Sequence, residues 1–149
     1  KGSEVNQAKK NKLEQTKPGT KYQPEWQPNK SVTTTELKET EEFVRVFKKP
    51  SDKFEDIDPK GNWMIRKDDI INKQTGKQYT AVEIKEKWSL AEVPDTIVDV
   101  KPEATTKVRV GEAAGRADGN EWGKGGGRQW EMDVEELPKH WFQNPKSLK

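Results

Sequence analysis

The segment from Gly123 to Glu131 places flexible backbone directly before a pair of polar side chains. Its successive glycines are Gly125, Gly126 and Gly127. Glycine adopts positive φ without a steric penalty, so these residues allow the main chain to approach a ligand closely. The residues that follow are typical of a strand, in which Gln129 and Glu131 share one face while Trp130 points to the other. An amide beside a carboxylate can bind hydroxyl groups, and the carboxylate can stabilise positive charge that develops on a sugar. A surface strand after an exposed loop fits the same residues, and both interpretations stay open at this point.

Two residues further upstream have side chains suited to a nucleotide. Arg45 lies in the β-branched and aromatic run Phe43–Phe47, which predicts a strand. Its side chain would point away from Val44 and Val46, and a guanidinium binds phosphate through forked hydrogen bonds. The competing interpretation is an exposed or salt-bridged strand residue. Trp63 is either a clamp for a nucleotide or a core residue.

The glycine-rich, Gln-bearing segment resembles the corresponding strand of necrotizing-toxin-type NAD glycohydrolases. The spacing of Gln129 and Glu131 is similar to the Gln-x-Glu pattern of ADP-ribosyltransferase-fold toxins. The upstream order agrees: an Arg within Val-Arg-Val-Phe, then Gly-Asn-Trp-Met, then Lys-Trp-x-Leu with a following Pro, then Val-Arg-Val-Gly. The resemblance covers about Phe43 to Phe142. Such domains often lie at the C-terminal tips of bacterial polymorphic and contact-dependent toxins, and a Lys-initiated fragment with a basic arm fits that placement.

The resemblance implies a role for each matching residue. Arg45 would hold the NAD phosphates, Trp63 would support the nicotinamide–ribose pocket, and the glycines Gly125, Gly126 and Gly127 would also contact NAD. Gln129 matches the family glutamine, and Glu131 matches the carboxylate that holds the nicotinamide ribose and stabilises the oxocarbenium-like state. Water as acceptor gives NAD hydrolysis, and a protein side chain as acceptor gives ADP-ribosylation. Further cationic candidates are Arg66 and Arg109, whereas His140 matches no family position.

The same resemblance implies the cofactors and partners of the protein. NAD is the substrate, and no metal is expected because the nicotinamide is already a cationic leaving group. A toxin of this kind implies a cognate immunity (inhibitor) protein, acidic where it covers Arg45 and Lys124. It also implies a secreted or cell-surface delivered protein that acts in the cytoplasm of the target cell.

Two alternatives come from other residues. Asp69, Glu83 and Lys85 resemble the Asp…Glu-x-Lys pattern of Mg-dependent nucleases, in which two carboxylates hold the metal and the lysine supports the attacking water. That pattern requires a strand over Val82 to Lys85. The other alternative is a non-enzymatic module that binds a partner protein through its tryptophans.

Composition limits the remaining possibilities. The chain has 149 residues, of which 29% are hydrophobic and 36% are charged, so we expect a small core rich in aromatic residues. The absence of cysteine excludes disulfides, thiolate zinc sites and a cysteine nucleophile. A net charge of +2 does not single out nucleic acid as a partner. No apolar run approaches the roughly 20 residues that span a bilayer.

The domain organisation is predicted from the distribution of charge and of the residues that interrupt secondary structure. Residues 1–32 are predicted to be a flexible basic arm, since residues 1–30 hold seven Lys against three Glu, with a helix over Val5–Thr16 as one possibility. Tyr22 and Trp26 are candidates to pin its end onto the domain. Residues 33–149 are predicted to be the NAD-binding domain. Its fold class is α+β, and the resemblance implies a small ADP-ribosyltransferase-like split, bent β-sheet with a few short helices.

Local patterns predict the individual elements. Capping boxes at Thr33/Glu36 and Thr80/Glu83 predict helices to about Glu42 and Leu90. The predicted strands are Phe43–Phe47, Gly61–Arg66, Thr96–Val100, Lys107–Val110 and Arg128–Met132. A turn is expected over Asn72–Gly76 and a loop over Gly111–Gly127. In the tail we expect a short helical turn, followed by Trp141 packed against the domain.

Overall fold

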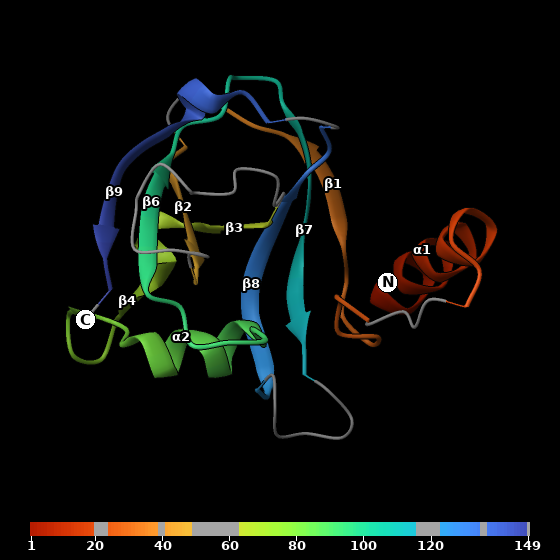
Figure 1. Ribbon diagram of the computed structural model, residues 1–149, viewed down its shortest axis with the longest axis horizontal. Helices are drawn as coiled ribbons and strands as arrows, with labels where there is room; N and C mark the ends of the chain where they lie inside the picture. The colour runs from red at the N-terminus through yellow and green to blue at the C-terminus, as the bar shows by residue number, and fades with distance from the viewer. Residues whose placement is uncertain (20–23, 39–40, 49–62, 116–122, 135–136, 149) are drawn as a thin grey trace.

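A computed structural model describes residues 1–19, 24–38, 41–48, 63–115, 123–134 and 137–148. These residues form an α+β fold with two α-helices and a mostly antiparallel sheet (Figure 1). The sheet has seven strands in the order β1-β7-β8-β3-β2-β6-β9. The strands are β1 (Thr33–Glu36), β2 (Phe43–Phe47), β3 (Trp63–Arg66), β6 (Thr96–Val100), β7 (Lys107–Ala114), β8 (Gly125–Met132) and β9 (Phe142–Ser147). The other elements are α1 (Gly2–Thr16), α2 (Ala81–Trp88), the hairpin of β4 (Ile71–Asn72) and β5 (Lys77–Gln78), and the 3₁₀ turns η2 (Lys67–Ile70) and η3 (Lys139–Trp141).

Alternation along the strands gives the sheet two buried faces. Phe43 and Trp130 belong to one hydrophobic cluster and meet edge to face, with ring centroids 5.1 Å apart. Val44 points to the other face, where it joins Ile84 and Trp88 of α2 in a second cluster. Because successive side chains point to opposite faces, the short run Phe43–Phe47 serves both clusters. This explains how a chain with few apolar residues still buries two layers.

Helix α2 begins as the sequence predicts. The Glu83 main-chain N–H donates to Thr80 Oγ1 at 3.2 Å, and the Thr80 N–H donates to Glu83 Oε1 at 2.9 Å, which completes the capping box. Ile84 and Trp88 are buried on the side of α2 that packs against the sheet. The helix therefore fixes the position of Trp88 near the start of β8.

Strands β2 and β3 separate soon after they pair. Their register joins Phe43 to Arg66 and Val44 to Ile65. From Arg45 onward β2 stays paired with β6, while β3 pairs with β8 at Trp63↔Glu131. The Arg45 guanidinium spans this separation by donating to the Trp63 carbonyl at 3.4 Å. The separation leaves room for side chains of β2, β3 and β8 to face a common space.

The segment before β1 is docked onto the sheet. Asn6 on α1 donates to the Trp26 carbonyl at 2.8 Å and accepts from the Trp26 N–H at 3.2 Å. Trp26 is fully buried and forms a bridge with Ala113 of β7. Main-chain bonds from Ala114 N–H to the Glu25 carbonyl and from Gln27 N–H to the Glu112 carbonyl, each 3.0 Å, continue the edge of β7 beyond β1. The range expected to be a flexible arm thus contains a 15-residue helix and a buried tryptophan in this structure, whereas Tyr22 lies outside the described residues.

Several predicted elements agree with the structure. The strands predicted at Phe43–Phe47 and Thr96–Val100 are confirmed with their bounds. The turn that ends at Gly76 and the helix after Thr80 are also present, although the helix ends at Trp88 rather than at about Leu90. Of the strand predicted at Gly61–Arg66, residues 63–66 form β3 and residues 61–62 lie outside the described residues.

Other predicted elements are wrong. The helix predicted from Thr33 is an exposed strand, β1, paired with β7. The loop predicted over Gly111–Gly127 is too long, because β7 continues to Ala114 and β8 begins at Gly125. Strand β9 was not predicted; it lies at the edge of the sheet, where a strand can contain a residue without a main-chain N–H such as Pro145.

Neither α-helix in the described part of the chain has the length and apolar character that crossing a lipid bilayer requires.

Candidate functional site

A cavity of about 290 Å³ lies where β2 and β3 separate. Its walls come from β2, β3, β8 and the end of β7, from the end of α2 and the residues that follow it, and from the segment that precedes Trp26. Arg45, Trp63 and Gln129 all line it. The structure therefore brings together three of the predicted site residues, which the sequence separates by up to 84 positions (45 to 129).

Glu131 lies beside this cavity, two residues beyond Gln129 on the same face of β8. It opposes Trp63 in the register of β3 with β8, and Arg109 in the register of β7 with β8. Its side chain is 11% exposed, and Oε1 accepts from Arg109 Nη1 at 3.0 Å. Arg109 therefore acts on the carboxylate from the neighbouring strand and compensates the burial of its charge.

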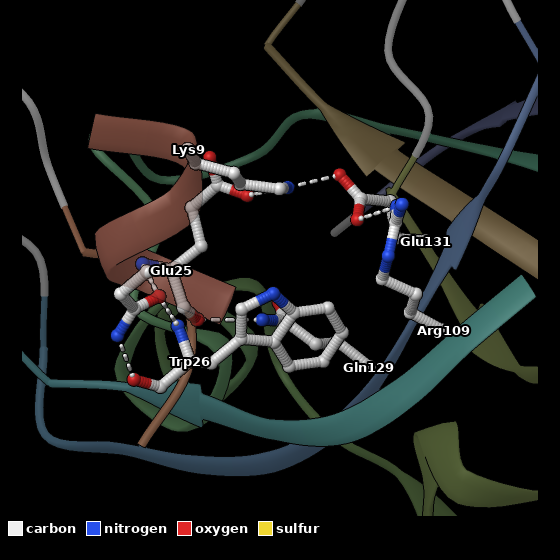
Figure 2. Close-up of polar contacts among 7 residues, drawn as sticks. Lys9, Glu25, Trp26, Arg109, Gln129 and Glu131 are labelled. Carbon is white, nitrogen blue, oxygen red and sulfur yellow. Dashed lines mark hydrogen bonds and ion pairs between the residues drawn. The ribbon is translucent and has the colours of Figure 1, made fainter. Parts of the chain in front are cut away.

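Lys9 of α1 reaches the same carboxylate from the other side (Figure 2). Its Nζ bonds Glu131 Oε2, lies 2.8 Å from Glu25 Oε2, and sits 4.8 Å from the centre of the Trp63 ring. Burial raises the pKa of Glu25 above its ordinary value of 4.5, and the Lys9 ammonium offsets part of that rise. Lys9 thus lies between two carboxylates and over an indole.

The main chain of the same segment engages Gln129. The Gln129 Nε2 donates to the Glu25 carbonyl at 2.7 Å, as Figure 2 shows. Trp26 follows, with its ring 5.1 Å from that of Trp63. The sequence pointed to Trp26 as an anchor but carried no signal for Lys9 or Glu25, because both lie in a polar stretch with no sustained apolar period.

The three glycines lie at the start of β8, and none of them lines the cavity. Gly125 and Gly126 have φ of +76° and +93°, so the positive φ expected from the sequence is present. Gly127 lies under Trp88, where a Cβ would come within 2.7 Å of the indole. Gly126 borders a second, more open hollow of about 470 Å³ together with Trp88 and Arg128. In this structure Gly127 therefore allows β8 to pass close to α2.

The remaining candidates lie elsewhere. Arg66 is on the opposite face of the sheet, with its guanidinium 5.8 Å from the centre of the Trp130 ring. Lys124 is exposed, and His140 is an exposed residue 3.6 Å from Glu103. None of the three lines the cavity.

The nuclease pattern does not have the geometry it requires. Val82 to Lys85 is helical within α2, and the Glu83 carboxylate belongs to the cap of that helix. Across residues 1–19, 24–38, 41–48, 63–115, 123–134 and 137–148 there is no group of three or more His, Cys, Asp or Glu side chains placed to hold a metal ion. The strand that the Asp69, Glu83 and Lys85 pattern requires is therefore absent over Val82 to Lys85, where the helix predicted from the Thr80/Glu83 capping box forms instead.

The fold and the cavity define an α+β protein with an Arg–Trp–Gln site and an adjacent buried glutamate. No protein-family model matches the chain, and neither a curated protein nor a solved structure matches it.

Proposed function

We propose that the chain is a bacterial toxin domain that acts on NAD and cleaves the nicotinamide–ribose bond, by hydrolysis or by ADP-ribose transfer. The observation that carries this proposal is the convergence of Arg45, Trp63 and Gln129 on one cavity with Glu131 beside it. The finer description of the fold as an ADP-ribosyltransferase-like split sheet belongs to the same proposal, and the separation of β2 from β3 supports it.

Each side chain has a part in the bond cleavage. Arg45 binds the diphosphate through its guanidinium, which keeps its charge at any working pH. Trp63 offers an indole face to the cationic nicotinamide ring. Gln129 and Glu131 bind the ribose hydroxyls from one face of β8. The C–N bond breaks with its electron pair leaving on nicotinamide, and a water or a protein nucleophile adds to the ribosyl carbon and loses its proton.

The largest electrostatic contribution falls to Glu131. Positive charge develops on the ribosyl carbon as nicotinamide leaves, and a fixed carboxylate next to that carbon stabilises the transition state more than the ground state. Glu131 is fixed, because Arg109 holds Oε1 at 3.0 Å from the neighbouring strand. Arg109 is therefore a positioning residue for this carboxylate.

The proposal includes partners and location. A cognate immunity protein would protect the producing cell by covering Arg45 and Lys124 with acidic residues, and the domain would be delivered from the secreting cell into the cytoplasm of its target. The substrate is NAD, without a metal.

The test measures nicotinamide release from NAD in the presence of EDTA. We expect release by the intact chain, and a fall of about 10²–10³-fold in Glu131→Ala or Gln129→Ala, the effect of removing one preorganised electrostatic group. Glu36→Ala is the matched control, since Glu36 is an exposed strand glutamate on β1. Circular dichroism should show that all three variants are folded. Full activity in both site variants, or no release by any form of the protein, would contradict the proposal.

A further inference from the structure

The Lys9 ammonium occupies a site that is built for a cation. Two carboxylates, from Glu25 and Glu131, bind its Nζ, and the Trp63 ring lies 4.8 Å below it. The side chain of Lys9 is only 24% exposed. Charge-assisted hydrogen bonds and a cation–π contact favour a compact ammonium at this point. An ordinary surface ion pair has neither the second carboxylate nor the aromatic face.

The fold presents Lys9 to this site through two anchors on the same side of α1. Gly2 donates its N–H to the Lys30 carbonyl at 2.9 Å. Its main chain also lies so close to Gln27 that a Cβ at this position would be 2.0 Å from the Gln27 carbonyl oxygen. Asn6 binds the main chain of Trp26 in both directions. Residues four and seven positions after Gly2 lie on the same side of a helix as Gly2. The two anchors, Gly2 and Asn6, therefore also turn Lys9 toward the sheet.

Occupation of the site engages both members of the amide–carboxylate pair. Glu131 uses Oε1 for Arg109 and Oε2 for Lys9. The Gln129 amide nitrogen is bound to the Glu25 carbonyl. A ligand hydroxyl that takes the place of Lys9 Nζ on Glu131 Oε2, or of the Glu25 carbonyl on Gln129 Nε2, must displace a contact of the N-terminal segment. The cavity that remains, about 290 Å³, is just below the roughly 300–1,000 Å³ typical of small-molecule sites.

We propose that Glu25, Glu131 and Trp63 form an ammonium-binding site, that its occupant within the chain is Lys9, and that this lysine excludes the dinucleotide from Glu131. The exclusion of the dinucleotide rests on the proposed function, whereas the ammonium site rests on the geometry alone. The ligand class is a primary ammonium of the lysine type. The same two carboxylates and indole that hold this cation are the groups that would face the cationic nicotinamide and ribosyl centre.

The ammonium site is tested by the reactivity of individual lysines in the full-length chain. A limiting amount of acetic anhydride, followed by peptide mass spectrometry, measures the acetylation rate of Lys9 against Lys12, an exposed lysine on the same helix. We expect Lys9 to react about 10-fold to 100-fold more slowly, the factor that one hydrogen bond to a charged group supplies. Glu131→Gln should raise the Lys9 rate, and Glu36→Gln should leave it unchanged.

The exclusion is tested by nicotinamide release from Lys9→Met, with Lys12→Met as control. We expect Lys9→Met to release nicotinamide about 10-fold to 100-fold faster than the unsubstituted chain, and Lys12→Met to match that chain. Lys9 acetylation as fast as that of Lys12 would overturn the inference even if NAD is cleaved. A protected Lys9 together with slower cleavage by Lys9→Met would make the lysine part of the catalytic machinery and also overturn it. A protected Lys9 with no cleavage by any variant would remove the proposed function and the exclusion, and leave the ammonium site confirmed.

Discussion

Replacing Trp26 with alanine asks whether the segment before β1 belongs to the cooperative fold. Trp26 is fully buried, and its ring lies 5.1 Å from that of Trp63. It packs against Gly111, where a Cβ would lie 2.9 Å from the indole. Main chain forms that wall and collapses little, so the truncation leaves a cavity. Phe or Trp to Ala changes at buried sites cost about 3–5 kcal/mol, a large part of the roughly 5–15 kcal/mol that stabilises a domain.

The assay is urea unfolding followed by far-UV circular dichroism, with a thermal melt alongside. We expect Trp26→Ala to lower the free energy of unfolding by about 3–5 kcal/mol and the midpoint temperature by roughly 6–20 °C. Trp26→Phe keeps most of the apolar contact with Trp63 and should cost clearly less. A change within about 0.5 kcal/mol, the range of ordinary surface substitutions, would refute the reasoning, because the burial of Trp26 would then be uncoupled from global folding.

Two more predictions concern the helix cap and a buried carboxyl. Thr80→Ala should lower the free energy of urea unfolding by about 0.5–2 kcal/mol, because it removes the acceptor for the Glu83 N–H, and Thr80→Ser should restore most of it; equal stability of the Ala and Ser variants would contradict this. Glu25→Gln removes a carboxyl whose pKa is raised above 4.5 by burial. The stabilisation from such a carboxyl is fully present below its unfolded pKa and is lost as the pH rises through the folded pKa. The free energy of unfolding of Glu25→Gln minus that of the unsubstituted chain should therefore increase from about pH 4 to about pH 7, and a flat or falling difference would count against it.

The two capping boxes show what a local pattern can predict. Thr80 and Glu83 precede a stretch whose apolar residues repeat at helical spacing, so cap and buried face agree and the helix forms. Thr33 and Glu36 have the same spacing but enclose only threonines, which favour strands because they are β-branched. Pairing with the free edge of β7 then satisfies their main chain. The second box failed as a predictor because a cap does not make a helix without an apolar face to bury.

The glycine-rich segment was informative for a different reason from the one expected. Close approach at Gly127 is real, but its partner is the Trp88 indole. Strand alternation correctly separated Gln129 and Glu131 from Trp130, since that rule depends only on the extended backbone. That Gln129 and Arg45 line one cavity was expected only from the family resemblance. Strand order depends on contacts across the whole chain, so local patterns could not predict it.

Lys9 and Glu131 are 122 residues apart, and their contact shows why the sequence did not reveal how the site is occupied. A buried carboxylate needs compensating charge, and Arg109, directly opposite in register, supplies one cation. The second cation, Lys9, is on a helix whose position is set by Gly2, a residue whose type disfavours a helix. With Lys9 in place, two carboxylates face two cations; without it, Glu25 and Glu131 face Arg109 alone, and the local charge becomes −1 when both are ionised. If the lysine leaves, the space over Trp63 therefore becomes more favourable for a cation. The nicotinamide ring of the proposed substrate carries a positive charge and would bind there.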